Sequence, residues 1–269
     1  MRWVRGPRSA PRAKSLLREK DEMDVKLELV FRSQQLGHDE NGHICWKVSE
    51  TLRTLHAAKT AILICDMWDK HWSRGASERV NEMAPRMNKV VRAARNKGAL
   101  VIHAPSDTLG FYAGAAARQR ALDAPETRPP AEIEHTDPAL PIDDSDGGSD
   151  TGETPWHKAW SRQHPAIEID EDKDLITDRG QEVYNIICQY DMRHVIIMGV
   201  HTNMCVLNRS FGIKQLVRWG VDVTLARNLT DTMYNPAMPP YVSHDDGTRL
   251  VIDYIEKFWC PTVVLYETT

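Results

Sequence analysis

Cys205 is a side chain whose place in the sequence could give it a chemical role. It follows an apolar run, residues 194–200, that is typical of a buried strand, and it precedes a helix-like segment, residues 206–219. The pattern predicts a sharp turn with the thiol at a helix N-terminus, where the first N–H groups and the helix dipole favour the thiolate. A thiolate is a good nucleophile. The alternative is a buried thiol that serves as a small hydrophobic side chain.

Asp66 is a candidate general base for that thiol. It comes directly after a continuous apolar run, residues 61–65, which predicts a strand buried on both faces. A carboxylate in this position is poorly placed to pair with solvent-facing lysines and well placed to face a cleft. The alternative is a carboxylate that only caps a turn.

The elements that must position these side chains alternate between apolar strands and amphipathic helices. Strands are expected at residues 61–65, 99–103, 166–169, 194–200, 221–226 and 262–265. The alternation predicts an α/β fold with three layers (α/β/α), in which helices cover both faces of a doubly wound, mainly parallel, six-stranded, Rossmann-like sheet. Ligands bind at the carboxyl ends of such strands, where Asp66, His103 and the turn at Cys205 would converge.

The chain divides into two parts by its pattern. Residues 1–58 are expected to form an N-terminal extension with a β-hairpin, because residues 25–31 alternate and residues 38–42 resemble a turn. Residues 59–269 are expected to form the α/β domain. Within it, an acidic stretch rich in proline and glycine, at about residues 107–160, predicts a surface insertion near the mouth of the active site.

Composition excludes several classes of partner. The formal net charge of -4 offers no basic footprint for nucleic acid. No apolar run approaches the length of a transmembrane helix, so no membrane contact is expected. Five widely spread cysteines without metal-like spacing favour reduced thiols and a cytoplasmic location. The basic residues 1–20 lack the apolar segment of a secretory signal, although a transit peptide is an open alternative.

Two motifs carry a resemblance to a known family. The sequence GVHTNMC at residues 199–205, with ICD at residues 64–66, resembles the isochorismatase-like cysteine hydrolases, the superfamily that includes nicotinamidases and N-carbamoyl amidases. The resemblance implies an Asp–Lys–Cys triad, in which Asp66 takes the thiol proton and Cys205 attacks a carbonyl carbon. It also implies an oxyanion hole from the N–H groups of His201 and Cys205, and a cis peptide bond just before His201. Family members often form oligomers, so a homo-oligomer is expected.

The lysine of the triad is where this sequence departs from the family. The family places it just after the third strand, and a strict register from the expected strand at 166–169 puts Asp170 there. Lys173 needs a short slip or a bulge to reach the site and is the best candidate. Lys158, in the segment before the strand, is the second. If neither enters the pocket, the triad is incomplete.

Other residues could contact the substrate. Trp68, Trp72 and Tyr112 lie on expected cleft loops and could stack on a flat small molecule, or they could be ordinary packing. Arg209, shortly after Cys205, could bind a substrate carboxylate with its planar fork, or it could form a salt bridge with a neighbouring acid.

A metal site is a weaker expectation. Asp69, His71 and His103 are weak candidates to hold a divalent ion such as zinc or iron, because carboxylate and imidazole suit these metals. The spacing differs from that of the nicotinamidases, and the favoured interpretation makes the two histidines hydrogen-bonding residues of the pocket. No cofactor is therefore expected to be required.

Three functional hypotheses follow. The first is a cysteine-dependent hydrolase that cleaves an amide or ureido C–N bond of a small molecule through a thioester-type intermediate. The second is a non-catalytic member of the fold that serves in binding or assembly, which the weak lysine motif supports. The third is a metal-dependent hydrolase in which Cys205 is incidental.

Overall fold

The computed structural model describes residues 25–154 and 157–268. Within them, eight strands form one sheet in the order β2-β1-β8-β7-β6-β3-β4-β5. Six strands run parallel and make up the core of the sheet: β3 (Thr60–Cys65), β4 (Leu100–Ala104), β5 (Leu175–Ile176), β6 (His194–Val200), β7 (Val223–Asp231) and β8 (Thr262–Val263). The expected parallel α/β sheet is confirmed, and an N-terminal hairpin extends it to eight strands.

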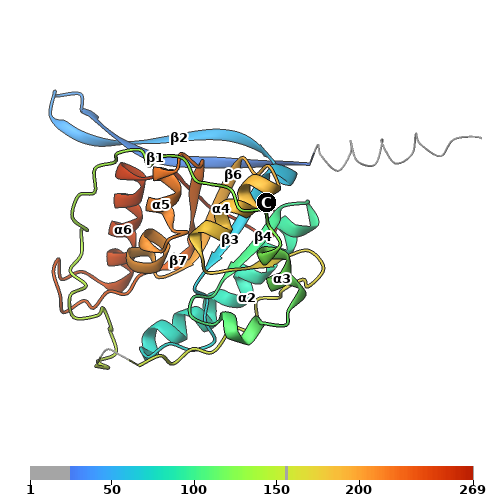
Figure 1. The fold of residues 1–269 in the computed structure, drawn as a ribbon. Coiled ribbons are helices and arrows are strands. Elements are labelled where there is room, and N and C mark those ends of the chain that lie inside the picture. Colours follow the sequence, from blue (N-terminus) through green and yellow to red (C-terminus); the bar gives the residue numbers. More distant parts are fainter. Residues whose placement is uncertain (1–24, 155–156, 269) are drawn as a thin grey trace, which may run out of the picture.

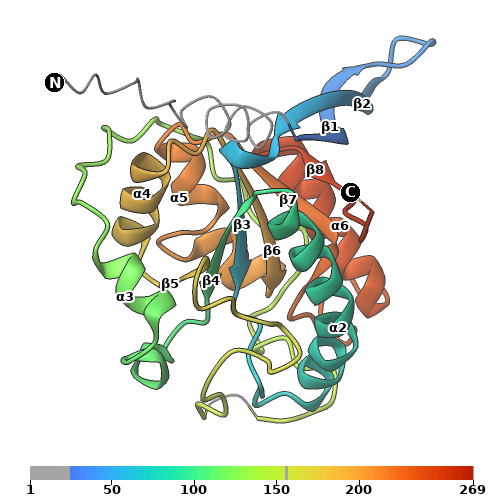
Figure 2. The ribbon, with the colours of Figure 1, turned by 90° about the vertical axis from the view of Figure 1, so that its right-hand side faces the viewer.

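Helices cover both faces of the sheet, as the alternating sequence predicts. On one face α2 (Arg74–Asn96) packs its apolar side against the even-numbered residues of β3. On the other face the apolar sides of α4 (Gly180–Gln189), α5 (Ile213–Arg218) and α6 (His244–Phe258) meet the odd-numbered residues of the same strand. Figure 2 shows α2 and α4 on opposite sides of the central strands. Every residue of β3 and β6 is buried, which explains their continuous apolar runs.

The N-terminal hairpin consists of β1 (Lys26–His38) and β2 (Ile44–His56), paired antiparallel over thirteen residues each. It joins the parallel sheet through β1, which pairs antiparallel with β8 at Arg32 and Thr262. Leu27, Leu29 and Phe31 are buried against the main core, so one face of β1 anchors the hairpin. Figure 1 shows the hairpin lying along the top of the molecule.

The expected strand at residues 166–169 is wrong. The backbone of Glu168 is bonded to side chains of α2, because its N–H donates to Asn88 and its carbonyl accepts from Arg95. The third strand of the α/β unit is instead β5, whose Leu175 pairs with Ile102 of β4. Residues 166–169 and β5 each contain a short apolar run, and only the pairing of β5 with β4 distinguishes the true strand.

The expected helix at residues 206–219 is interrupted. A π-helical turn at Thr202–Val206 follows β6, and only α5 is a regular helix within the range. Gly212 separates the two, because its N–H closes a turn on the carbonyl of Arg209 and its Cα lies close to the carbonyl of Val206. A β-carbon at position 212 would collide with that carbonyl.

The acidic stretch at about 107–160 is mainly irregular and includes the short helix α3 (Ala116–Leu122), which packs beside β5. Among the described residues, no helix has both the length and the apolar character needed to cross a bilayer. The basic segment 1–20, named above for a targeting role, lies outside the described residues.

Candidate active site

Asp66 and Cys205 meet at the carboxyl edge of the sheet. Asp66 follows β3, and Cys205 lies in the π-helical turn after the neighbouring strand β6. The Asp66 side chain is fully buried, and the Cys205 thiol lies close enough to its carboxylate for each to shift the pKa of the other. The Oδ1 atom of Asp66 also accepts the backbone N–H of Ser106 at 2.7 Å. This arrangement allows a proton to pass directly from sulfur to oxygen.

The resting Cys205 is a thiol, which differs from the thiolate expected from a helix N-terminus. Burial and the negative charge of Asp66 raise the pKa of Cys205 well above its ordinary value, and Arg209 offsets this only in part. Burial also raises the pKa of Asp66, whereas Arg209 and the hydrogen bonds from Ser106 and Cys205 lower it. This environment favours the thiol over the thiolate.

Arg209 is the cation beside this pair. It lies one turn beyond Cys205, and its backbone N–H donates to the Cys205 carbonyl at 3.0 Å. Its Nε donates to Asp66 Oδ2 at 3.2 Å, and its Nη2 lies 3.5 Å from Asp107 Oδ2. Of the two roles considered for Arg209, the salt bridge to a neighbouring acid is the one that the structure contains. The side chain is also part of the cavity wall described below.

The prediction that Lys173 completes a triad is not supported by its position. Its side chain is 67% exposed, and its ammonium lies 3.8 Å from Asp170 Oδ2 on the surface. The cause is the misplaced strand: because β5 is Leu175–Ile176, the residues that follow the third strand are Thr177 and Asp178. No lysine occupies these two positions.

Lys158, the second candidate, lies on the wall of the cavity, where its ammonium donates to the backbone carbonyl of Asp107. Among the described residues, the cation that forms an ion pair with Asp66 is Arg209. The prediction of a triad cation considered only lysines. Arg209 lies four residues after Cys205, one helical turn along the chain, and this spacing could have indicated it.

The backbone before Cys205 has the geometry that the resemblance implied. The peptide bond between Val200 and His201 is cis. The backbone of His201 lies near the Cys205 sulfur and lowers the pKa of the thiol slightly, against the larger effect of burial. The His201 ring is buried, and its Nε2 has no hydrogen-bond partner within the described part of the chain. Burial lowers the pKa of His201 well below its ordinary value, so the ring is neutral.

A cavity of about 630 Å³ opens above the sulfur. Cys205 and His201 form part of its lining, and aromatic rings form much of the remainder: Trp68, His71, Trp72 and Trp160. The rings of Trp68 and Trp160 stack with centroids 4.3 Å apart and planes 17° apart. His71 lies parallel to Trp160 with centroids 5.7 Å apart. The aromatic part of the wall is therefore flat and apolar, which suits a planar small molecule, whereas Asp107, Lys158 and Arg209 add charged groups to the lining.

Trp68 and Trp72 line the cavity, whereas Tyr112 does not. The Tyr112 side chain is buried, and its hydroxyl accepts the backbone N–H of Gln163 at 2.8 Å, so it packs the insertion against the core. Trp160 is an aromatic residue of the cavity that the sequence analysis missed. It belongs to the irregular part of the insertion, where periodicity gives no signal for the direction of a side chain.

The three weak metal candidates do not form a donor set. Both oxygens of Asp69 accept from Ser161. The Nδ1 of His71 accepts a backbone N–H, and burial lowers the His71 pKa to about 4. The ring nitrogens of His103 lie within hydrogen-bond distance of Gln163 and Asp174. Within residues 25–154 and 157–268, no cluster of three or more His, Cys, Asp and Glu side chains could hold a metal ion.

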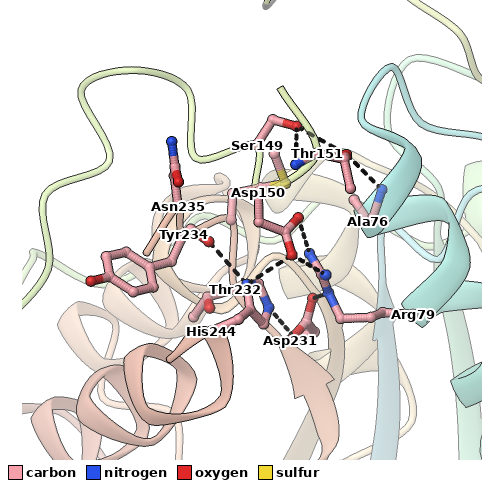
Figure 3. A network of polar contacts seen from close by, with 12 residues as sticks. Ala76, Arg79, Ser149, Asp150, Thr151, Asp231, Thr232, Tyr234, Asn235 and His244 are labelled. Atoms are coloured by element: carbon pink, nitrogen blue, oxygen red, sulfur yellow. Dashed lines mark hydrogen bonds and ion pairs between the residues drawn. The ribbon is translucent and has the colours of Figure 1, made fainter. Parts of the chain in front are cut away.

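A charged network ties the insertion to the end of β7 (Figure 3). Arg79 of α2 donates to Asp150 of the insertion at 2.7 Å and to Asp231 at the end of β7 at 2.8 Å. His244, at the start of α6, has its Nε2 2.9 Å from Asp231. Burial lowers the His244 pKa, but the bond to Asp231 outweighs this effect and the pKa is raised overall. Three other chain segments, α2, β7 and α6, therefore share this network with the insertion.

Asn203 of the GVHTNMC motif fastens the same insertion to the nucleophile turn. Its amide nitrogen donates to Asp144 at 2.7 Å and to the Met233 carbonyl at 3.0 Å, and its amide oxygen accepts the Met233 N–H at 2.9 Å. Gly148 lies so close to Met233 that a β-carbon would come within 2.4 Å of its backbone. The insertion is thus packed onto the turn that carries Cys205.

No protein-family model and no curated protein matches this chain. Solved structures that resemble it include a cysteine hydrolase from Pseudomonas syringae pv. phaseolicola 1448A, at 16% identity and a TM-score of 0.49, over 78% of this chain and 90% of that one. Another is an isochorismatase from Pseudomonas putida KT2440, at 11% identity and a TM-score of 0.47, over 77% and 89% of the two chains. A third is an isochorismatase family protein from Desulfovibrio vulgaris subsp. vulgaris str. Hildenborough, at 12% identity and a TM-score of 0.40, over 73% and 89%. Their names are those of the family that the motif around Cys205 resembles.

Proposed function

We propose that this protein is a cysteine-dependent hydrolase that cleaves an amide or ureido C–N bond of a small molecule. One observation carries the proposal: the Cys205 thiol, which lines an aromatic cavity, interacts with the fully buried carboxylate of Asp66. A nucleophile paired with a base, and opening into a cavity, is the arrangement that covalent catalysis needs.

In the proposed reaction, Asp66 accepts the thiol proton as the Cys205 sulfur bonds to the carbonyl carbon. The backbone N–H of His201, and that of Cys205 itself, would stabilise the negative oxygen of the tetrahedral intermediate. Asp66 then returns the proton to the leaving nitrogen as the C–N bond breaks, which leaves a thioester and a free amine or ammonia. Water adds to the thioester with Asp66 again as the base, and the acid product leaves as the sulfur regains a proton.

Arg209 takes the place of a triad cation in this proposal. Its guanidinium opposes the effect of burial on Asp66 and so favours the carboxylate that acts as the base. It reaches Asp66 from the segment after the nucleophile, whereas the resemblance places the lysine after the third strand. Arg209 is therefore proposed as a positioning residue that acts through Asp66.

Arg209→Gln is expected to lower kcat/KM on the order of tenfold to a hundredfold. This is the rate factor that corresponds to the loss of one hydrogen bond to a charged group. It is also expected to move the acid limb of the pH–rate profile to higher pH, because loss of the cation raises the pKa of Asp66 and the base then loses its charge at a higher pH. Arg209→Lys should restore part of the shift. Lys173→Gln, which removes a surface cation outside the cavity, is the control and should leave the limb in place. An unmoved limb in Arg209→Gln would show that Arg209 does not act through Asp66.

The function itself is tested by incubating the protein with flat carboxamides, carbamoyl amino acids and biuret-like compounds while ammonia or amine release is measured. For a compound that is turned over, rapid quench and mass spectrometry should find the acyl group on the peptide that contains Cys205. Turnover should persist after dialysis against a chelator, which separates this function from a metal-dependent hydrolase. Binding of such compounds without any release would favour the non-catalytic alternative.

A further inference from the structure

The hairpin carries a concentration of exposed apolar side chains far from the cavity. They are Val30, Leu36, Ile44, Trp46, Val48 and Leu52. All have even numbers, and directly paired residues share a face, so all six lie on one face of the two-stranded ribbon. Two of these residues, Ile44 and Leu52, are 70% and 65% exposed. Apolar surface gathered in this way marks an interaction site.

The same hairpin leaves a long strand edge open. β2 is the last strand in the sheet order, and among the described residues only β1 pairs with it. It is thirteen residues long, it contains no proline, and its register with β1 runs without a bulge. Proteins usually protect such an edge with proline, bulges or short length, because its free N–H and C=O groups recruit another strand.

We propose that β2 pairs antiparallel with β2 of a second copy, about a two-fold axis at Val48. The two sheets then become one continuous sheet across the axis. A second copy is the partner because this segment of β2 is complementary to itself in that register. Ile44 of each copy meets Leu52 of the other, and the two Val48 side chains meet at the axis, so these apolar residues pair with one another, while Trp46 of each copy meets Glu50 of the other.

Like charges disfavour two other registers, those with the axis at Glu50 or at Lys47. An axis at Glu50 would place two Glu50 carboxylates together and Lys47 opposite Arg53. An axis at Lys47 would place two ammonium groups together. The axis at Val48 instead sets Lys47 opposite Ser49, and pairing over residues 44–52 leaves Arg53 free to keep its ion pair with Asp222 at 2.8 Å. Like charges directly opposite one another destabilise a sheet.

A disulfide tests the register. The axis places Cys45 of one copy opposite Thr51 of the other, with Cα atoms about 5 Å apart, which is within disulfide range. In a single chain these positions are six residues apart along β2, about 20 Å, so they cannot join internally. Thr51→Cys is therefore expected to form a covalent dimer under mild oxidation, through the free thiol of Cys45. The added Cys45→Ser change should abolish the link.

Matched controls make the result decisive. Ser49→Cys introduces a thiol on the same face, two residues nearer to Cys45, and should not cross-link. By analytical ultracentrifugation the wild type should be a dimer, Val48→Lys a monomer, and Val48→Thr a dimer. A monomeric wild type would overturn the proposal. So would a dimer in which Thr51→Cys fails to cross-link, or cross-linking that persists without Cys45, since either would place the contact elsewhere.

Discussion

Cys205→Ala is expected to abolish hydrolysis while the fold stays intact. Removal of the sulfur removes the atom that forms the thioester, and for nucleophiles of this kind the loss in kcat is on the order of 10⁴-fold or more. The fold should survive because the turn is held by Asn203 and by backbone hydrogen bonds, such as that from Val206 N–H to the His201 carbonyl, and none of these uses the thiol.

The measurement is product release at saturating substrate, beside far-UV circular dichroism and thermal unfolding. Cys188→Ala is the control, because Cys188 is an exposed free thiol on α4. Turnover retained in Cys205→Ala would refute the covalent mechanism. Loss of activity in Cys188→Ala as well would point to general damage.

Asp66→Asn is expected to slow acylation by at least about a hundredfold, the scale of a lost general base. Asparagine has a similar shape but cannot accept the thiol proton. The same change should make the thiol easier to ionise, because the Asp66 charge and its hydrogen bond both raise the pKa of Cys205. Iodoacetamide should therefore label Cys205 faster in the variant at a fixed pH, even as turnover falls.

These opposite effects separate a base from a residue that only holds the sulfur in place. Single-turnover kinetics with mass detection of the acyl-enzyme gives the acylation rate, and alkylation gives the thiolate fraction. Asp191→Asn, which changes an exposed carboxylate paired with Lys59, is the control. Unchanged acylation in Asp66→Asn would contradict the role of base, and slower alkylation would show that Asp66 does not raise the thiol pKa.

Local sequence patterns were sufficient to predict the strands whose residues are all buried. The continuous apolar runs before Asp66 and Cys205 predicted β3 and β6. A strand that is covered on both faces has no solvent-facing position for a polar residue, so its sequence is apolar throughout. The rule that parallel strands present their carboxyl ends at one edge then predicted that the two side chains meet. The hairpin followed from the alternation in β1, one face of which is buried.

Local patterns failed where side chains of distant elements decide the structure. Residues 166–169 have the composition of a strand, but Asn88 and Arg95 of α2 bind the backbone of Glu168. That error moved the expected lysine position onto Lys173, which lies at the surface. The position of Trp160 in the cavity likewise depends on a distant residue, because its ring stacks on that of Trp68.

The sequence by itself determined the parallel sheet and the meeting of Asp66 with Cys205, the candidate base and nucleophile, because apolar periodicity and chain order specify which strand ends coincide. Only the tertiary structure decided that an arginine rather than a lysine is the cation at Asp66, and that the thiol rests protonated. Both depend on burial and on contacts between groups far apart in the chain, such as Arg209 Nε and Asp66 Oδ2, which are 143 positions apart and 3.2 Å from each other, and no local pattern encodes such contacts.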